Sequence, residues 1–368
     1  MSSITIVLPF GGYAMYSEQG TQIRMLLRSG QVVEIGGNPE RRNQTPNLNS
    51  VSTTSLVLAF AAIYLIWGST YLAIRYAVET IPPLLMMAAR HFTAGIALYA
   101  WLRLRGTPAP LRTHWKSAAI AGAFFFLGSH GMLAWAEQKV PSGLAALLCA
   151  TLPLWIVALS KFLGKRRDLS GKVIAGLVLG FIGVAVLIGP AAFHSENNLS
   201  LFGAAVVLFC AFLWAAGTMY TQRAWLPSSS SLSSAMQMIM GGVLLCVVGA
   251  ATGEAGRFYV AGLTLKSVLA LAYLTVFGSL VAFTAFTWLH KVSSPTRNST
   301  YAYVNPVVAV FIGWLLAGEP VGVRTLAATV IILSGVALVN MTGRESAELK
   351  HNRGDEVKFR EHQCSAAD

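Results

Sequence analysis

The sequence places very few ionisable side chains inside its long apolar stretches, and those few are the candidates for chemistry. His130 and Glu137 lie seven residues apart in one such stretch, so a helix puts both on one face. A histidine titrates near neutral pH, and a carboxylate further along the same face could pass a proton to the solvent beyond the helix end. The pair is therefore the best candidate for a proton path. A polar face that is hydrogen-bonded within a helix bundle is the alternative.

Arg90 is the only Lys or Arg well inside a stretch that is long enough to cross a bilayer. An arginine at that depth costs about 2.5–3.5 kcal/mol on insertion scales and marks a functional site by default. Two interpretations stay open. Arg90 is an anion-binding or gating residue, or it is a structural arginine bonded to carbonyls or to a neighbouring helix. The adjacent His91 is interpreted as a packing histidine that points elsewhere on the helix.

Two prolines predict interrupted backbone within the apolar stretches. Pro306 cannot donate a backbone hydrogen bond, which leaves a carbonyl of the preceding turn open. Open backbone at membrane depth is tolerated where it lines a cavity. Tyr301 and Asn305 precede this proline and share one helical face. Pro153, followed by Trp155, is the matching position in an earlier stretch. A merely kinked packing helix is the alternative.

Aromatic and hydroxyl side chains gather in two further stretches. One carries Trp67, Ser69, Thr70 and Tyr71, and the other carries Trp214. Such surfaces suit amphipathic or cationic organic solutes, through apolar contact and cation–π attraction. Aromatic side chains of an interfacial belt are the alternative interpretation.

The composition excludes a water-soluble globule. Of the 368 residues, 55% are hydrophobic and only 11% are charged, against roughly 25% charged in soluble domains. The formal net charge of +12 is spread between apolar segments and does not form one basic face, so we expect no nucleic-acid partner. There is no nucleophile elbow, zinc-protease motif or nucleotide-binding loop, and the cysteines lack metal spacing. The sequence therefore predicts neither an enzyme nor a cofactor or metal site.

Hydropathy predicts ten transmembrane helices, so the fold class expected is an all-α polytopic membrane protein. With a cytoplasmic amino terminus, the inner connections carry twelve Lys or Arg residues and the outer ones five. This bias places both termini in the cytoplasm of a bacterial-type plasma (inner) membrane. The predicted spans are 55–75, 82–102, 116–136, 142–161, 171–190, 199–222, 230–251, 265–289, 295–317 and 322–342.

The ten spans divide into two similar sets of five. Lys139-Val140-Pro141-Ser142 resembles Lys291-Val292-Ser293-Ser294, and each follows a Gly-Ser pair, Gly128-Ser129 and Gly278-Ser279. An odd number of spans per repeat turns the second copy over, and inverted repeats are common in transporters that work by alternating access. Four domains follow: a polar extension over 1–53 that is predicted to be disordered, five-helix repeats over 54–191 and 199–342, and a cytoplasmic tail over 343–368.

Several motifs resemble the drug/metabolite transporter superfamily, specifically its EamA-type ten-helix exporters. The similarity covers about residues 55–342 and is specific as a set. The stretches that carry it are Ile66-Trp67-Gly68-Ser69-Thr70-Tyr71, Ala89-Arg90-His91-Phe92, Trp135-Ala136-Glu137-Gln138-Lys139-Val140-Pro141-Ser142-Gly143, Ser299-Thr300-Tyr301-Ala302-Tyr303-Val304-Asn305-Pro306 and Gly318-Glu319.

This resemblance implies a secondary transporter with a central cavity between its halves, which exports metabolites, amino acids or drugs. The expected partners are a small-molecule substrate and the lipid bilayer, with a proton as the candidate coupling ion. Two departures stand out: Gly164-Lys165 replaces the usual Gly-Glu, and Asn305 replaces a frequent Glu, which puts proton coupling at that position in doubt. An uptake permease of the same fold and an intramembrane lipid-modifying enzyme are the alternatives.

Overall fold

The protein is described by a computed structural model in which two compact units are separate, residues 1–55 and residues 56–368. In the first unit the structure describes four strands and the residues from 52 onward. In the second it describes residues 56–163, 171–188, 199–293 and 300–339. The predicted tail over 343–368 lies outside the described residues, and so does most of the predicted extension over 1–53.

The strands of the first unit form an antiparallel meander in the order β1-β2-β3-β4. Their bounds are Ile4–Val7, Tyr13–Tyr16, Ile23–Leu26 and Val32–Ile35. Each is a short run rich in β-branched, aromatic or other apolar residues, which favour extended backbone. The disorder that the sequence predicts for 1–53 stays a prediction.

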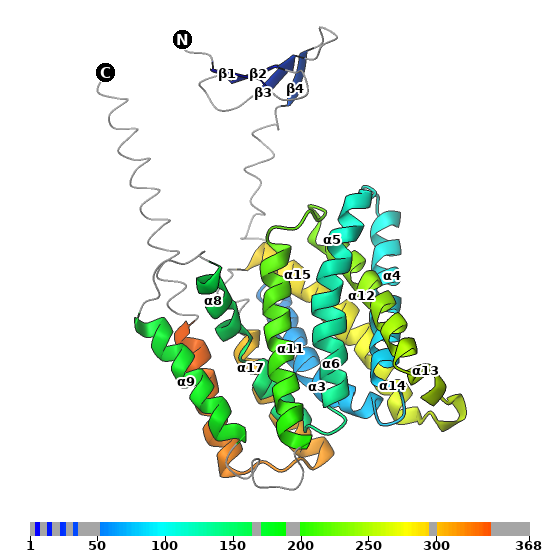
Figure 1. The fold of residues 1–368 in the computed structure, drawn as a ribbon, viewed down its shortest axis with the longest axis vertical. Helices are drawn as coiled ribbons and strands as arrows, with labels where there is room; N and C mark the ends of the chain where they lie inside the picture. Colours follow the sequence, from blue (N-terminus) through cyan, green and yellow to red (C-terminus); the bar gives the residue numbers. More distant parts are fainter. Residues whose placement is uncertain are drawn as a thin grey trace. The chain divides into compact units, whose positions relative to one another are not determined.

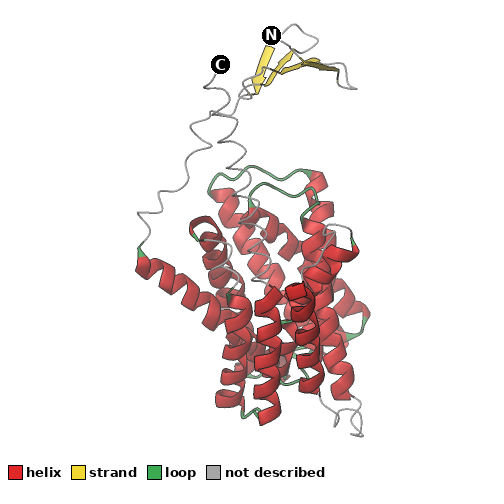
Figure 2. Cartoon of the chain, turned by 90° about the vertical axis from the view of Figure 1, so that its left-hand side faces the viewer, coloured by secondary structure: helices red, strands yellow, loops and turns green. Residues whose placement is uncertain are grey.

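The second unit is all-helical in the part of the chain that the structure describes, and its long helices run roughly side by side (Figures 1 and 2). The first five segments run from residue 53 to residue 188. They are α2 (Thr53–Ala62) with η2 (Ile63–Trp67) and α3 (Gly68–Ala77); α4 (Pro83–Leu104); α5 (Arg112–Gly122) with η3 (Ala123–Gly131) and α6 (Met132–Ala136); α7 (Ser142–Cys149) with α8 (Leu152–Phe162); and α9 (Gly171–Ile188).

The remaining segments run from residue 199 to residue 339. They are α11 (Leu199–Thr221); α12 (Ser230–Ala251), followed by α13 (Glu254–Arg257) and η4 (Val260–Gly262); α14 (Leu265–Tyr273) with η5 (Leu274–Val281) and α15 (Ala282–Val292); α17 (Tyr301–Ala317); and the helix Val323–Val339. Three of the described segments are π-helical, namely η2, η3 and η5. Of these, η3 contains the Gly128-Ser129 pair and η5 contains the Gly278-Ser279 pair.

Seven of the described helices are long and apolar enough to cross a membrane, and α17 and Val323–Val339 are shorter apolar helices. The 22-residue α4, which carries Arg90, is a further long helix. The prediction of an all-helical polytopic membrane protein is therefore confirmed at this level for the second unit. The count of ten crossings and the inverted repeat stay predictions.

Local sequence explains where the helices begin and end. Pro83 occupies the first turn of α4, where a missing N–H costs nothing. The Ser229 hydroxyl accepts the Leu232 N–H at 3.3 Å and caps α12, and Thr264 caps α14 through the Ser267 N–H at 3.2 Å. Gly318 ends α17 with φ of +61°, a conformation that glycine adopts without strain.

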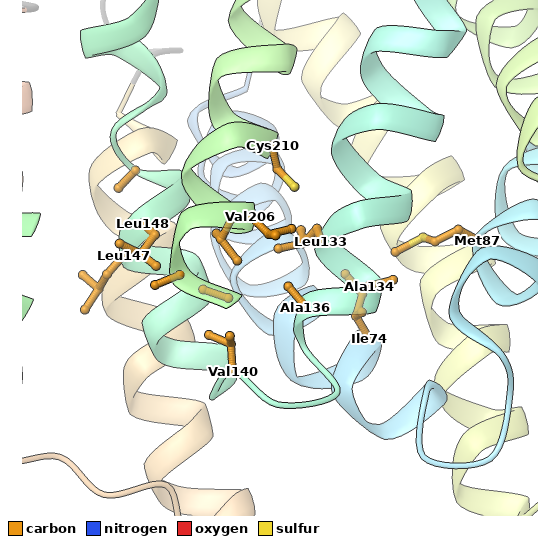
Figure 3. Close-up of a cluster of buried hydrophobic side chains, with 14 of the residues drawn as sticks. Ile74, Met87, Leu133, Ala134, Ala136, Val140, Leu147, Leu148, Val206 and Cys210 are labelled. Atoms are coloured by element: carbon orange, nitrogen blue, oxygen red, sulfur yellow. The ribbon is translucent and has the colours of Figure 1, made fainter. Parts of the chain in front are cut away.

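Helices of the first set of five pack against helices of the second set. The helix α4 packs along α12, and α7 packs on α17. The helix α3 contacts α14 and α17, while α11 contacts η3, α7 and α8. Between them lies a buried apolar cluster that includes Met87 on α4, Leu133 on α6, Leu148 on α7 and Val206 on α11 (Figure 3). The two sets therefore share one core.

The crossing of α4 and α12 depends on glycine at positions 95 and 242. A Cβ atom added at Gly95 would lie 2.8 Å from the Ile239 nitrogen, and one at Gly242 would lie 2.8 Å from the Phe92 nitrogen. These neighbours are backbone atoms, so they cannot move aside as the end of a side chain can. Small residues allow this close approach where lipid supplies no hydrophobic drive.

We expect Gly95→Ala to destabilise the protein by about 1–3 kcal/mol, since overpacking a tight contact forces the two backbones apart. The measurement is thermal unfolding of the purified protein in detergent micelles. Gly256→Ala is the matched control, because an added Cβ there meets nothing within 4 Å. Equal melting temperatures for the two variants would contradict the close crossing.

Candidate functional site

Arg90 reaches from α4 to the π-helical segment η5. Its Nε atom donates a hydrogen bond of 3.0 Å to the Ser279 hydroxyl, and only 5% of the residue is exposed. Gly278 provides the space beside the guanidinium, since a Cβ there would lie 3.2 Å from Nη2. The Arg90 side chain thus joins a helix of the first set to a helix of the second.

His130 pairs with His91, which the sequence interpretation places elsewhere on its helix. The Nδ1 atom of His130 and the Nε2 atom of His91 are 3.0 Å apart, so one ring donates and the other accepts. The ring centroids lie 5.0 Å apart in a stacked arrangement, and Phe126 covers His91 at 4.4 Å. This pair links η3 to α4, and no hydrogen bond joins His130 to Glu137 among the described residues.

Glu137 follows α6 and is 1% exposed. Both of its carboxylate oxygens are enclosed without a hydrogen-bond partner among the residues that the structure describes. Burial raises the pKa of this carboxyl well above its ordinary value, and the charge of Glu319 raises it further, against the opposing effects of Arg75 and Arg90. Burial and the neighbouring Glu319 charge therefore favour the neutral, protonated form of this carboxyl.

Two rings from two other helical segments contact Trp67. The Trp67 centroid lies 5.0 Å from that of Phe286 and 5.4 Å from that of Tyr301, and the latter two are 5.7 Å apart. The indole N–H of Trp67 donates to the Gly278 carbonyl at 3.1 Å. Since Gly278 precedes the partner of Arg90, this aromatic cluster lies next to the guanidinium.

Trp214 on α11 forms a second aromatic group with the first set of helices. Its centroid lies 4.9 Å from that of His130 and 4.8 Å from that of Phe125. Trp155 belongs to neither group, because its ring contacts Phe181 on α9 and Phe212 on α11. The structure therefore separates Trp155 from the rings around Trp67.

The remaining residues of α3 have different roles in packing. The Ser69 hydroxyl bonds the Tyr273 hydroxyl at 2.6 Å, which ties α3 to α14. Thr70 is buried and its hydroxyl donates to the Trp67 carbonyl at 2.6 Å. Tyr71 is half-buried and lies next to Cys149 of α7.

The two prolines have different local structures. Pro153 lies in the first turn of α8, and residues 150 and 151 form a turn that separates α7 from α8. Pro306 lies inside α17, which continues through it. Asn305 is buried there, and its Oδ1 atom has no hydrogen-bond partner in the described residues. Only the first proline therefore marks an interrupted helix.

The Glu319 carboxylate links α7 to α3. In the sequence this residue stood out only as part of the Gly318-Glu319 motif. Its carboxylate accepts hydrogen bonds from the Ser142 N–H at 2.8 Å, the Ser142 hydroxyl at 2.7 Å and the Gly143 N–H at 3.0 Å, and it pairs with Arg75. It thus caps α7 while it holds α3. Burial raises the pKa of Glu319, but these donors outweigh burial and hold the pKa below its ordinary value.

Further polar contacts join the two sets near the same helix ends. Glu254 accepts the Leu84 N–H at 2.9 Å and so caps α4. Lys266 pairs with Glu79 at 2.6 Å, and the Ser267 hydroxyl donates to the Tyr76 carbonyl at 2.7 Å. The sequence counterpart of Glu319, Lys165, lies outside the described residues.

Sequence reasoning missed several contributors to the site. Arg75, Ser279 and Phe286 were not singled out, and His91 was interpreted as packing only. The repetition of the Gly-Ser pair in the two sets was the sequence signal that pointed to Ser279. The structure places both pairs in π-helical segments. Among the described residues, no group of three or more His, Cys, Asp or Glu could hold a metal ion.

Comparison with known proteins places these features in context. The description of the EamA-like transporter family matches the chain twice, over residues 54–189 and 201–341. The uncharacterized inner membrane transporter YedA of Escherichia coli (strain K12) is 38% identical over 287 residues, which span 77% of this chain and 90% of that protein. The uncharacterized transporter YoaV of Bacillus subtilis (strain 168) is 25% identical over 289 residues, spanning 78% and 97%.

A solved crystal structure has the same fold. It is 21% identical, covers 80% of this chain and 100% of its own, and superposes with a TM-score of 0.55. At this identity the likeness concerns the fold alone.

Proposed function

The chain belongs to the EamA-like transporter family, and from that premise we propose that it is a secondary active transporter that exports small metabolites, amino acids or drugs. It would work by alternating access in the inner (plasma) membrane, as a multi-pass protein. The name of the 38% identical relative, an inner membrane transporter, supports this location. The positive-inside count supports cytoplasmic termini.

One observation carries the proposal: polar and aromatic side chains from both sets of helices meet inside the helical bundle. Arg90 bonds Ser279, and Trp67 bonds Gly278, so α4 and η2 both meet η5. His130 contacts Trp214 across η3 and α11. Polar groups inside a bilayer are costly and mark solute pathways. Trp67, Tyr301, His130 and Trp214 are only half-buried although each contacts rings of other helices.

The pattern of helix contacts supports two inverted repeats of five helices. Exchanging the two sets turns several of the contacts into others that are present: α3 on α14 and α17 corresponds to α11 on η3 and α7, while α4 on α12 maps onto itself. A two-fold axis through the core would produce this pattern. The two matches to one family description support it as well.

Alternating access requires that one end be closed while the other opens. The end that carries Arg75, Glu254 and Glu319 is tied by hydrogen bonds between the two sets. The charge bias predicts that this end faces away from the cytoplasm. We therefore propose that the described arrangement is closed to the outside, and that the ties around Glu319 break when the solute leaves.

We further propose the proton as coupling ion and Glu137 as the group that carries it. A buried carboxyl with a raised pKa and no hydrogen-bond partner among the described residues favours its protonated form, and it gains a charge when it releases the proton. An uptake permease remains the alternative for direction. An intramembrane lipid-modifying enzyme would need His, Asp or Glu clustered for catalysis, and among the described residues only His91 and His130 are paired.

The test is a resistance screen in which cells overproduce the chain and are challenged with toxic amino acids and drugs. We expect tolerance of at least one compound, with lower intracellular levels. Asn305→Leu is expected to abolish that tolerance, because it removes a buried polar group from the proposed path. Membrane insertion should be unchanged. Gly256→Ala is the matched control, and full tolerance with Asn305→Leu would show that α17 does not line the path.

A further inference from the structure

Arg90 is a buried cation that no described carboxylate neutralises. The ion pairs among the described residues are Arg75 with Glu319 and Lys266 with Glu79. A buried charge without a counter-ion is energetically costly. In the structure described, no ion pair among the described residues offsets the unfavourable free energy of burying the Arg90 charge. An anion that enters from outside the chain would offset it.

The free part of the guanidinium has the geometry that a carboxylate needs. Of its five N–H donors, only the one on Nε has a hydrogen-bond partner among the described residues, the Ser279 hydroxyl. The two Nη nitrogens form no hydrogen bond with these residues, and 5% of the residue is exposed. Paired N–H groups of a guanidinium bind both oxygens of a carboxylate at once. The outward edge of Arg90 is thus available to such a group.

Glu137 does not fill this position. Its oxygens are enclosed without hydrogen-bond partners among the described residues, and burial favours its neutral form. No ion pair joins Arg90 to a carboxylate of the described residues. An entering anion would therefore not have to displace such a partner.

The neighbouring surface is aromatic. Trp67 donates to Gly278, the residue that precedes the hydrogen-bond partner of Arg90, and its ring contacts Phe286 and Tyr301. Both Trp67 and Tyr301 are half-buried. A charged head beside an apolar wall of this kind suits a solute with an anionic end and an apolar body.

We propose that Arg90 binds a carboxylate of the transported solute, and that the solute is an organic acid whose apolar or aromatic body lies against Trp67 and Tyr301. This rests on the proposed transport function and names the solute class for it. Arg90 is then the residue that determines specificity, and not only a link between α4 and η5.

The experiment uses three probes with the same body and different heads: 3-phenylpropanoate, 3-phenylpropanol and 3-phenylpropylamine. Their binding to the purified full-length protein in detergent micelles is measured by calorimetry at pH 7. We expect the carboxylate to bind at least about tenfold more tightly than the alcohol, as an Arg–carboxylate pair supplies a charge-assisted bond. Equal binding of the three probes, or tighter binding of the amine, would overturn the proposal.

Variants separate a specificity role from a structural one. Arg90→Gln should remove the preference for the carboxylate, and Arg90→Lys should keep part of it, since lysine keeps the charge without the planar donors. Arg103→Gln on the same helix is the control, because Arg103 is exposed and bonds only the Thr107 carbonyl among the described residues. An unchanged preference in Arg90→Gln would overturn the proposal. Should Arg90→Gln fail to fold, Arg90→Lys and the wild-type ranking decide the question.

This outcome is separable from the proposed function. A chain that confers resistance in the screen but binds all three probes alike transports a solute of another class. In that case the assignment of Arg90 fails while the transport function stands. A chain that binds the carboxylate through Arg90 but confers no resistance contradicts export instead.

Discussion

Replacing Glu319 with alanine is expected to lower the free energy of unfolding by about 3 kcal/mol or more, since truncating one member of a buried ion pair typically costs 3–5 kcal/mol. The carboxylate is 6% exposed and has partners on two other segments. Its loss leaves the Arg75 cation, the Ser142 N–H and the Gly143 N–H without their acceptor. Partial exposure of Arg75 keeps the estimate at the lower end.

The measurement is unfolding of the purified protein in detergent micelles, followed by thermal or denaturant titration. Glu319→Gln should have an intermediate effect, because the amide oxygen still accepts an N–H bond but the charge is gone. Glu79→Ala is the matched control: its pair with Lys266 also joins the two sets of helices, but the side chains are 43% and 49% exposed. Such exposed pairs contribute about 0–1 kcal/mol. Equal losses for Glu319→Ala and Glu79→Ala would contradict a buried cross-link at Glu319.

The pH dependence of this cross-link has a definite sign. The pKa of Glu319 is held below its ordinary value near 4.5, so its stabilising contribution is complete above that value and is lost as the pH falls. Glu319→Ala should therefore differ most from the wild type at neutral pH. The two proteins should converge under acidic conditions.

How far the sequence predicts the fold depends on whether the signal is local. Span positions follow from hydropathy along the chain, and the predicted 142–161 and 230–251 lie close to α7–α8 and to α12. The end of α17 at Gly318 likewise follows from one residue type with a known preference. Such features need no knowledge of what lies beside them. They could be predicted for that reason.

Side-chain partners between distant helices could not be predicted in this way. The pairing of His91 with His130 depends on how α4 meets η3, and η3 is π-helical over Ala123–Gly131, so the regular helical periodicity assumed for that span does not apply. Arg90 was a candidate from its depth alone, but its partner Ser279 lies 189 residues away in the sequence. Glu319 was visible only as a repeat element, and its donors at Ser142 and Gly143 come from another helix.

The second large effect is expected at Glu137, in the slope of stability against pH. A carboxyl whose pKa is raised in the folded state stabilises the fold while it is protonated in that state, and this contribution is lost as the pH rises through the raised pKa. Between its ordinary value near 4.5 and the raised one, stability falls by about 1.4 kcal/mol per pH unit. Glu137→Gln places a neutral side chain of nearly the same shape there, so its stability should lack this slope.

The wild type and Glu137→Gln are compared by unfolding in detergent micelles at several pH values from 5 to 9. Six groups interact electrostatically with Glu137: Arg75, Arg90, Glu319, Tyr71, Cys149 and Cys210. All six are present in both proteins, so the difference between the two stability curves isolates the Glu137 carboxyl. Glu79→Gln, at an exposed site, should instead run parallel to the wild type. Parallel curves for Glu137→Gln and the wild type would show that Glu137 is ionised throughout. A carboxylate that stays ionised would offset part of the Arg90 charge, and neither the proton-carrying role of Glu137 nor the uncompensated charge of Arg90 would then hold.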